Sequence, residues 1–228
     1  MKFLLTNDDG IHAPGLAALA EAARHFGELV IVAPEECHSG CGHQTTTHRP
    51  LRVVEHGERR FAVNGTPADC VRIALEHFAS DADFVLAGVN AGGNLGVDVV
   101  MSGTVAAVRE AMFLGKRGIA FSQYRKQRSF DAWEKSIRMA MSVLRDLLAR
   151  ECEPRSFWNV NFPDEPDAEI PVAVDCAVDP SPLAFRFEAV NDAFHFRSNY
   201  HARPRLPQHD VDVCFSGRIA ISAVRQSA

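Results

Sequence analysis

The chain has 228 residues and a mass of 25.0 kDa, with 46% hydrophobic and 23% charged residues. This composition, with 15 glycines and 12 prolines, excludes disordered, collagen-like and disulfide-scaffold proteins, and the length suits one α/β or all-β unit with a modest appendage. The net charge of −5 argues against a broad basic surface for duplex nucleic acid or an anionic membrane, but it is compatible with a small phosphorylated substrate.

The chain begins with the pattern of a strand, a helix and a second strand. Residues 3–6 form a short apolar run, and residues 14–26 then carry apolar side chains at helical spacing. Pro14 suits a first helical turn and Gly27 suits a helix end. Residues 29–33 are a second apolar run of strand length, so the three elements have the size of a βαβ unit.

The alternation of helices and strands continues to residue 150. The sequence TPAD at 66–69 is typical of a capped helix start, and residues 84–89 then predict a buried strand. A further helix is predicted over 102–114, a strand over 119–122 and the longest helix over 133–150. Continuous apolar strands between helices predict an α/β fold, with a doubly wound, mostly parallel sheet covered on both faces.

The pattern changes near residue 165, where proline-rich segments and shorter strands replace the regular alternation. Strands are predicted at 171–178, 185–190, 210–215 and 219–224. We interpret them as antiparallel excursions and a C-terminal arm of the same domain. The chain thus divides into a core, residues 1–165, and a β-rich extension, residues 166–228.

The predicted location is the cytoplasm. The apolar run at the N-terminus is too short for a signal-peptide core, and no run approaches the roughly 20 apolar residues of a membrane helix. The six cysteines are therefore expected to be reduced, mostly as small buried side chains.

Unusual polar residues follow three of the predicted strands. They are the segments NDDG at 7–10, HSGCGH at 38–43 and GVNAGGNLG at 88–96. Ligands of an open parallel sheet bind outside the carboxyl ends of its strands, so these loops are expected to meet at one edge.

Two adjacent carboxylates at this edge, Asp8 and Asp9, repel each other unless a cation lies between them. Together with Ser39 and Asn90 they offer hard oxygen ligands that suit Mg²⁺ or Mn²⁺. The alternative is that Asp8 and Asp9 only form a turn and cap the following helix, which an isolated NDDG would favour. The convergence of three loops favours the metal site.

An anion site is predicted at Ser102, Gly103 and Thr104. The helix that starts there offers backbone N–H groups, two hydroxyls and the positive end of the helix dipole. The alternative is an ordinary helix cap. The glycines of 92–96 permit close approach to a ligand, but neither a dinucleotide fingerprint nor a P-loop is present. Residues 124–128 (YRKQR) are interpreted as a solvated loop, or alternatively as a lip that attracts an anionic substrate.

A zinc site is a weaker alternative. It would use the four potential ligands Cys37, His38, Cys41 and His43, but zinc sites usually place their ligand pairs around a longer loop. His12 and His43 are better candidates for proton transfer or for supporting a metal ligand.

Taken together, these motifs closely resemble the SurE family, the stationary-phase survival proteins that are metal-dependent nucleotidases. The resemblance runs in order through residues 5–16, 32–34, 39–43, 49–53, 64–70, 88–96, 102–105 and 159–163. The segments 44–48 and 121–125 depart from the family pattern, and the match is thin beyond residue 165.

The resemblance implies a Rossmann-like catalytic core and a C-terminal arm exchanged in a homodimer or homotetramer. It implies one divalent cation per subunit, held by Asp8, Asp9, Ser39 and Asn90, and phosphate contacts from Asn94, Ser102, Gly103 and Thr104. The implied reaction is hydrolysis of nucleoside 5′- and 3′-monophosphates.

The catalytic residues are expected to be Asp8 and Asp9. Water activated near Asp8 is the favoured nucleophile, with direct attack by an aspartate as the alternative. Two other functions remain open: a catalytically silent nucleotide or metal sensor or scaffold, and a phosphatase acting on sugar phosphates or polyphosphate.

Overall fold

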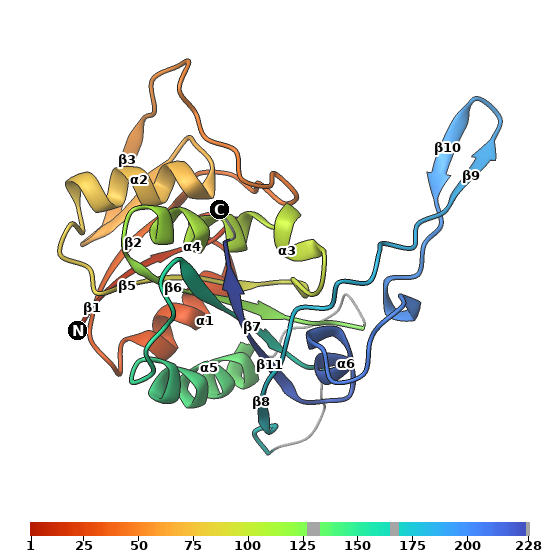
Figure 1. Cartoon of the computed structure of the whole chain (residues 1–228). Coiled ribbons are helices and arrows are strands. Elements are labelled where there is room, and N and C mark those ends of the chain that lie inside the picture. The colour runs from red at the N-terminus through yellow and green to blue at the C-terminus, as the bar shows by residue number, and fades with distance from the viewer. Residues whose placement is uncertain (127–132, 165–168, 227–228) are drawn as a thin grey trace.

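A nine-stranded sheet runs through the molecule in the order β3-β4-β2-β1-β5-β6-β7-β11-β8 (Figure 1). The structure is a computed structural model and describes residues 1–126, 133–164 and 169–226. The strands of this sheet are β1 (Lys2–Thr6), β2 (Glu28–Pro34), β3 (Val53–Gly57), β4 (Arg60–Val63), β5 (Phe84–Asn90), β6 (Arg117–Gln123), β7 (Ser156–Phe162), β8 (Ala173–Asp175) and β11 (Ile219–Arg225).

The central strands are parallel, as the apolar runs predict. Strand β1 lies between β2 and β5, and its residue Phe3 pairs with Leu29 on one side and Phe84 on the other. The parallel pairing continues through β6 to β7, whereas β11 is antiparallel to β7 and β3 is antiparallel to β4. The predicted α/β class, with a mostly parallel sheet and antiparallel excursions, is confirmed.

Helices cover both faces of the sheet. They are α1 (Pro14–Ala23), α2 (Pro67–His77), α3 (Asp98–Met101), α4 (Gly103–Phe113), α5 (Trp133–Leu147) and α6 (Asp210–Phe215), with a short 3₁₀ turn at Tyr200–Ala202. Leu16 of α1 and Leu144 of α5 belong to one buried cluster, and Val71 of α2 and Val108 of α4 belong to another. Two separate cores therefore hold the central strands rigid from both sides.

The start of α2 confirms the predicted cap. The Thr66 hydroxyl accepts a hydrogen bond from the Asp69 N–H at 3.2 Å, and the Asp69 carboxylate accepts one from the Thr66 N–H at 3.0 Å. This reciprocal pair satisfies two N–H groups that a helix start otherwise leaves without partners.

The predicted strand at 210–215 is wrong, because this segment is helix α6. The alternation of Val211 and Val213 with polar residues imitates a strand. In the structure, the Asp210 carboxylate accepts the Val211 N–H at 2.8 Å, and one helical turn buries both Val211 and Cys214. Local hydrogen bonding and packing on the sheet decide the conformation here.

Other boundaries moved less. The helices predicted at 14–26 and 133–150 end at Ala23 and Leu147, and the strand predicted at 171–178 shortens to Ala173–Asp175. Strands β3, β4, β7 and β10 had no predicted counterpart among the apolar runs.

A separate two-stranded hairpin, β9 (Phe187–Val190) and β10 (Ala193–Phe196), projects far from the body on an extended connection (Figure 1). Every residue of these two strands is exposed. Among the described residues, no helix is both long and apolar enough to cross a bilayer.

Candidate active site

The turn after β1 presents Asp8 and Asp9. Its closing hydrogen bonds come from Asn7, whose amide donates to the Gly10 carbonyl at 2.9 Å and accepts the Gly10 N–H at 3.3 Å. Helix α1 begins after Ala13 without a side-chain cap. The alternative in which the two aspartates cap this helix is therefore wrong.

Asp8 is a buried carboxylate at the centre of the site. Its Oδ1 accepts a hydrogen bond from the Thr104 hydroxyl at 2.5 Å. Burial raises the pKa of Asp8 to about 6, and the neighbouring Asp9 charge adds to this rise, while the Thr104 hydrogen bond opposes it. A carboxylate held in this way is stabilised by a nearby cation.

Asp9 links the turn after β1 to the loop after β5. Its pKa is raised mainly by burial, against which the backbone N–H of Ala91 and the charge of Arg125 act. In the same loop, the Asn90 side-chain amide donates to the Gly92 carbonyl at 2.8 Å. Because the amide nitrogen is held there, the oxygen of Asn90 is the atom left to serve as a ligand.

The loop after β2 is tied to the same place. The His38 N–H donates to the Asp8 carbonyl at 2.7 Å, one residue before Ser39. Ser39 is exposed, and its hydroxyl lies 3.0 Å from the Cys37 sulfur. Cys41 lies beside Asp8, since burial and then the charge of Asp8 raise the pKa of this thiol. The sequence reasoning considered Cys41 only as a zinc ligand and missed this position.

The start of helix α4 packs directly against Asp8. Ser102 caps the helix by accepting the Val105 N–H at 3.1 Å. A Cβ atom on Gly103 would lie 2.8 Å from the Cβ of Asp8 and 3.1 Å from the Cys41 sulfur. Only glycine lets the helix start approach Asp8 so closely, so the positive end of the helix dipole lies beside this carboxylate.

The polar groups of Asn94 make hydrogen bonds within the protein. Its side-chain amide donates to the Ser122 hydroxyl at 2.8 Å, and its backbone N–H donates to Asn161 at 2.8 Å. The amides of Asn159 and Asn161 both donate to its carbonyl. Asn94 thus fastens the glycine-rich loop to β6 and β7, and a substrate contact from it stays a prediction. The signal for this support was the pair of asparagines in the apolar strand at 156–162.

His43 turns away from the cysteines of its loop. Its Nε2 lies 2.6 Å from one carboxylate oxygen of Glu110. The other oxygen of Glu110 accepts a hydrogen bond from Arg72 at 2.6 Å. Within the described ranges, no three His, Cys, Asp or Glu side chains form a metal-binding cluster. A cation at Asp8 and Asp9 would therefore need hydroxyl and amide oxygens to complete its ligands, as the sequence predicts.

A cleft of about 700 Å³ opens beside the Asp9 loop. Its lining residues come from the loop after β5, the end of β6 and the extension: Ala91, Gly92, Gly93, Tyr124, Arg125, Lys126, Tyr200 and His201. The Tyr124 hydroxyl lies 2.7 Å from His201 Nδ1, so the wall from the extension is fastened to β6. The sequence favoured a solvated loop at 124–128, with a lip for an anionic substrate as the alternative; residues 124–126 line the cleft, and 127 and 128 lie outside the described residues. No local signal pointed to Tyr200 or His201.

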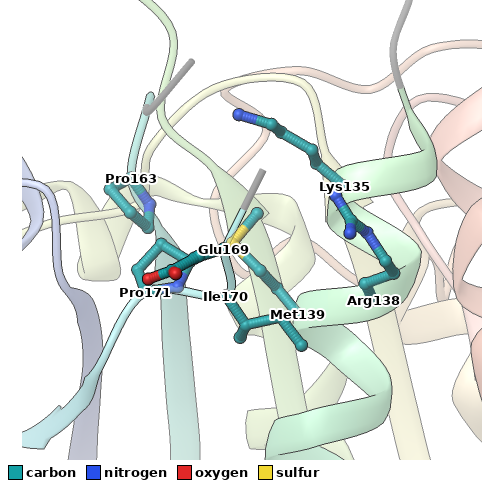
Figure 2. A pocket seen from close by; sticks show the side chains of 7 residues that line it. All are labelled: Lys135, Arg138, Met139, Pro163, Glu169, Ile170 and Pro171. Carbon is teal, nitrogen blue, oxygen red and sulfur yellow. The ribbon is translucent and has the colours of Figure 1, made fainter. Parts of the chain in front are cut away.

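A second hollow lies between α5 and the segment that follows β7. Figure 2 shows Lys135 and Arg138 on the helix side and Glu169 and Pro171 across from them. Its volume is only about 10 Å³, room for roughly one water molecule, and no predicted site residue lines it. It is not a substrate site.

Comparisons with known proteins identify the family of this chain. Residues 3–178 match the family described as "Survival protein SurE". Relatives from Nostoc sp. and Synechocystis sp., each described as a putative 5′-nucleotidase, are 47% identical over 226 and 229 residues, which is 99% of this chain and 100% of theirs. The 5′-nucleotidase SurE 1 of Burkholderia lata is 47% identical over 172 residues, covering 74% of this chain and 66% of its own. The crystal structure of the SurE protein from Aquifex aeolicus superposes with a TM-score of 0.88 at 28% identity, covering 99% of this chain and 93% of that one.

Proposed function

The chain belongs to the SurE family, and from this premise we propose that it is a metal-dependent 5′-nucleotidase that releases phosphate from nucleoside 5′- and 3′-monophosphates. The observation that carries the proposal is the close packing of the buried carboxylate Asp8, which is followed directly by Asp9, against the start of α4. Such an arrangement would set a cation site beside an anion site, which is what phosphate-ester hydrolysis needs.

The donor atoms around Asp8 fit a hard divalent cation. Asp8, Asp9, Ser39 and Asn90 would hold it together with water, and one Mg²⁺ or Mn²⁺ per subunit is the cation these oxygens suit. The orientation of the Asn90 amide and the raised pKa of Asp8 support this set.

When bound, such a cation would polarise a phosphoryl oxygen and lower the pKa of a coordinated water. The chain supplies the positioning. Ser102, Gly103 and Thr104 would direct the N–H groups of the helix start at the phosphate oxygens, and Asn94 would keep the opposite loop in place. Asp8, oriented by Thr104, would accept the proton of the attacking water.

The proposal includes an assembly and a location. The exposed hairpin β9–β10 would act as an arm that joins two copies in a homodimer or homotetramer. None of the six cysteines is paired in a disulfide, which fits a reducing compartment such as the cytoplasm.

The decisive test is phosphate release from nucleoside 5′- and 3′-monophosphates, sugar phosphates and polyphosphate, with Mg²⁺ or Mn²⁺ and with EDTA. We expect metal-dependent release from the nucleotides, and none after chelation. Preferred hydrolysis of sugar phosphates or polyphosphate would replace the nucleotide substrate by another phosphate ester or by a phosphoanhydride. The absence of release with either metal would support a nucleotide or metal sensor instead. Covalent aspartyl-phosphate trapped during turnover would replace water by an aspartate as the nucleophile.

A further inference from the structure

The charges at the proposed site do not balance without another cation. A divalent cation neutralises Asp8 and Asp9, but a phosphate monoester adds a charge of about −1.5 to −2 at neutral pH. The start of α4 contributes only about half an elementary charge. Since the whole chain has a net charge of −5, this balance requires a cationic side chain close to the phosphate.

We propose that Arg125 is that side chain: a further catalytic residue whose guanidinium binds the phosphoryl oxygens of the substrate. This inference rests on the proposed function, because it assigns a residue to the same phosphate site. Arg125 follows the end of β6 by two residues and therefore lies at the carboxyl edge of the sheet. It lines the large cleft together with Ala91 and Gly92, which directly follow Asn90.

The cleft borders Asp9, because the backbone N–H of Ala91, one of its lining residues, donates to that carboxylate. The charge of Arg125 also acts on Asp9. A guanidinium in the cleft that borders Asp9 and the residues after Asn90 stands where the phosphate of a bound substrate is expected.

An aromatic ring supports the guanidinium. The central carbon of the Arg125 guanidinium lies 4.5 Å from the ring centre of Trp133, a cation–π distance. Trp133 in turn packs on α1, since a Cβ atom on Gly15 would lie 2.9 Å from the indole. A stacked, planar guanidinium loses little freedom on binding a phosphate and can donate two parallel hydrogen bonds to it.

Neighbouring cations are placed less favourably. Arg109 donates to the Val99 carbonyl at 2.9 Å, and Arg203 forms an ion pair with Asp98 at 2.5 Å. Lys126 lines the same cleft but is exposed at its rim. Arg125 combines a position in the cleft, partial burial and coupling to Asp9.

In the reaction, the water oxygen forms a bond to phosphorus while the ester P–O bond breaks. The nucleoside oxygen leaves with a proton, and inorganic phosphate remains in the site. The non-bridging oxygens carry negative charge throughout, so Arg125 would stabilise both the transition state and the bound product.

The experiment compares Arg125→Gln, Arg125→Lys and the matched control Arg117→Gln. Arg117 lies at the other end of β6 and also stacks on an aromatic ring, Phe84, at 4.1 Å. Inorganic phosphate is titrated into the Mn²⁺-loaded protein by calorimetry, Mn²⁺ binding is followed by electron paramagnetic resonance, and kcat and KM are measured with a nucleoside 5′-monophosphate.

For Arg125→Gln we expect the Kd of phosphate to rise at least about tenfold and kcat to fall about 10²- to 10³-fold, the usual effect of losing one transition-state donor. Mn²⁺ affinity should stay equal or increase, because a positive charge near Asp9 is removed. Arg125→Lys should fall between this variant and the wild type, and Arg117→Gln should match the wild type in all three measurements.

Two results would overturn the proposal: an unchanged phosphate Kd in Arg125→Gln, or parallel loss of Mn²⁺ binding and thermal stability in both Arg125 variants, which would show a structural role. Phosphate binding does not depend on turnover. A wild-type protein that binds phosphate through Arg125 but hydrolyses no nucleotide would refute the proposed function alone.

Discussion

The carboxyl edge of the sheet and the β9–β10 hairpin depart from ordinary burial in opposite directions. At the edge, polar groups are buried: Asp8 is 4% exposed and Thr104 is 0% exposed. In the hairpin, large apolar groups are exposed: Phe194 is 77% and Phe196 is 61% exposed. Both arrangements cost free energy in an isolated chain. The difference fits the proposals of a charged ligand at the edge and of an apolar partner surface for the hairpin.

One buried carboxylate connects the two regions. Asp210 of the extension accepts the Gly96 N–H at 2.8 Å through one oxygen and the Asp179 N–H at 2.8 Å through the other. The glycine-rich loop beside the cleft is therefore held by the part of the chain that also carries the hairpin. The following predictions test this contrast, from the largest expected effect on turnover to the smallest.

Asp8→Asn should lower turnover by about 10³-fold or more. The proposed metal would lose a charged ligand, and with it several kcal/mol of transition-state stabilisation. The same change should stabilise the metal-free protein at pH 7. Burial raises the pKa of Asp8 from 3.8 to about 6, so its contribution to stability falls as the pH rises through that interval. At about 1.4 kcal/mol per unit, the gain is about 1–3 kcal/mol.

Phosphate release and thermal unfolding at pH 4 and pH 7 measure these two effects. The stability gain of Asp8→Asn should appear at pH 7 and vanish at pH 4. Turnover close to that of the wild type would remove Asp8 from the catalytic residues.

Gly103→Ala should reduce turnover about 10- to 100-fold, because the new methyl group meets Asp8 at 2.8 Å and must displace it. Gly65→Ala is the matched control. Gly65 lies just before α2 and outside the proposed site, and its new methyl group would meet the Asp69 side chain at 2.9 Å. Mn²⁺ titration should show weakened binding only for Gly103→Ala, whereas unfolding should show a loss of stability for both. Equal Mn²⁺ affinities in Gly103→Ala and the wild type would contradict the close approach of α4 to Asp8.

Asp210→Ala should destabilise the protein by about 2–4 kcal/mol, because the buried N–H groups of Gly96, Asp179 and Val211 lose their acceptor. Turnover should fall less than about tenfold, since Asp210 lies outside the proposed metal and phosphate contacts. Denaturant unfolding and steady-state kinetics separate the two effects. A variant with wild-type stability would show that the loop after β5 does not depend on the extension.

The paired change Phe187→Ser and Phe196→Ser should leave turnover per site within about twofold while it weakens self-association at least about tenfold. The two rings contact each other with their centres 5.5 Å apart, on a hairpin that projects away from the body of the molecule (Figure 1). Light scattering over a range of concentrations measures the mass. A wild-type protein that is monomeric at every concentration would show that the hairpin does not join two copies of this chain.

Local sequence patterns were sufficient for much of the fold. Apolar runs at β1, β2 and β5 and the helical stripe of α5 are periodic signals, and the capping box at Thr66 is a contact between residues three positions apart. The glycines around the site could also be interpreted locally. Gly10 has a φ of 104°, which a turn of this kind requires of a glycine.

The candidate site was predictable where its residues directly follow strands. Because parallel strands end at one edge, the order of the motifs was enough to bring Asp8, Asn90 and the loop of Ser39 together. The misassigned helix α6 shows the limit of such reasoning. Its alternating valines fit either conformation, and the contact between Asp210 and Gly96, 114 positions apart, stabilises the helix against the loop.

By itself, the sequence determined the α/β class, the family and the residues that gather at the carboxyl edge, because these depend on periodicity and on motifs of adjacent residues. Only the tertiary structure decided that Asn7 closes the turn and leaves both aspartates available, that Tyr200 and His201 complete the cleft, and that Arg125 lies beside Asp9. The physical reason is range. Hydrogen bonds and charges between distant segments depend on how the elements pack, and no local pattern encodes which side chains that packing brings within reach.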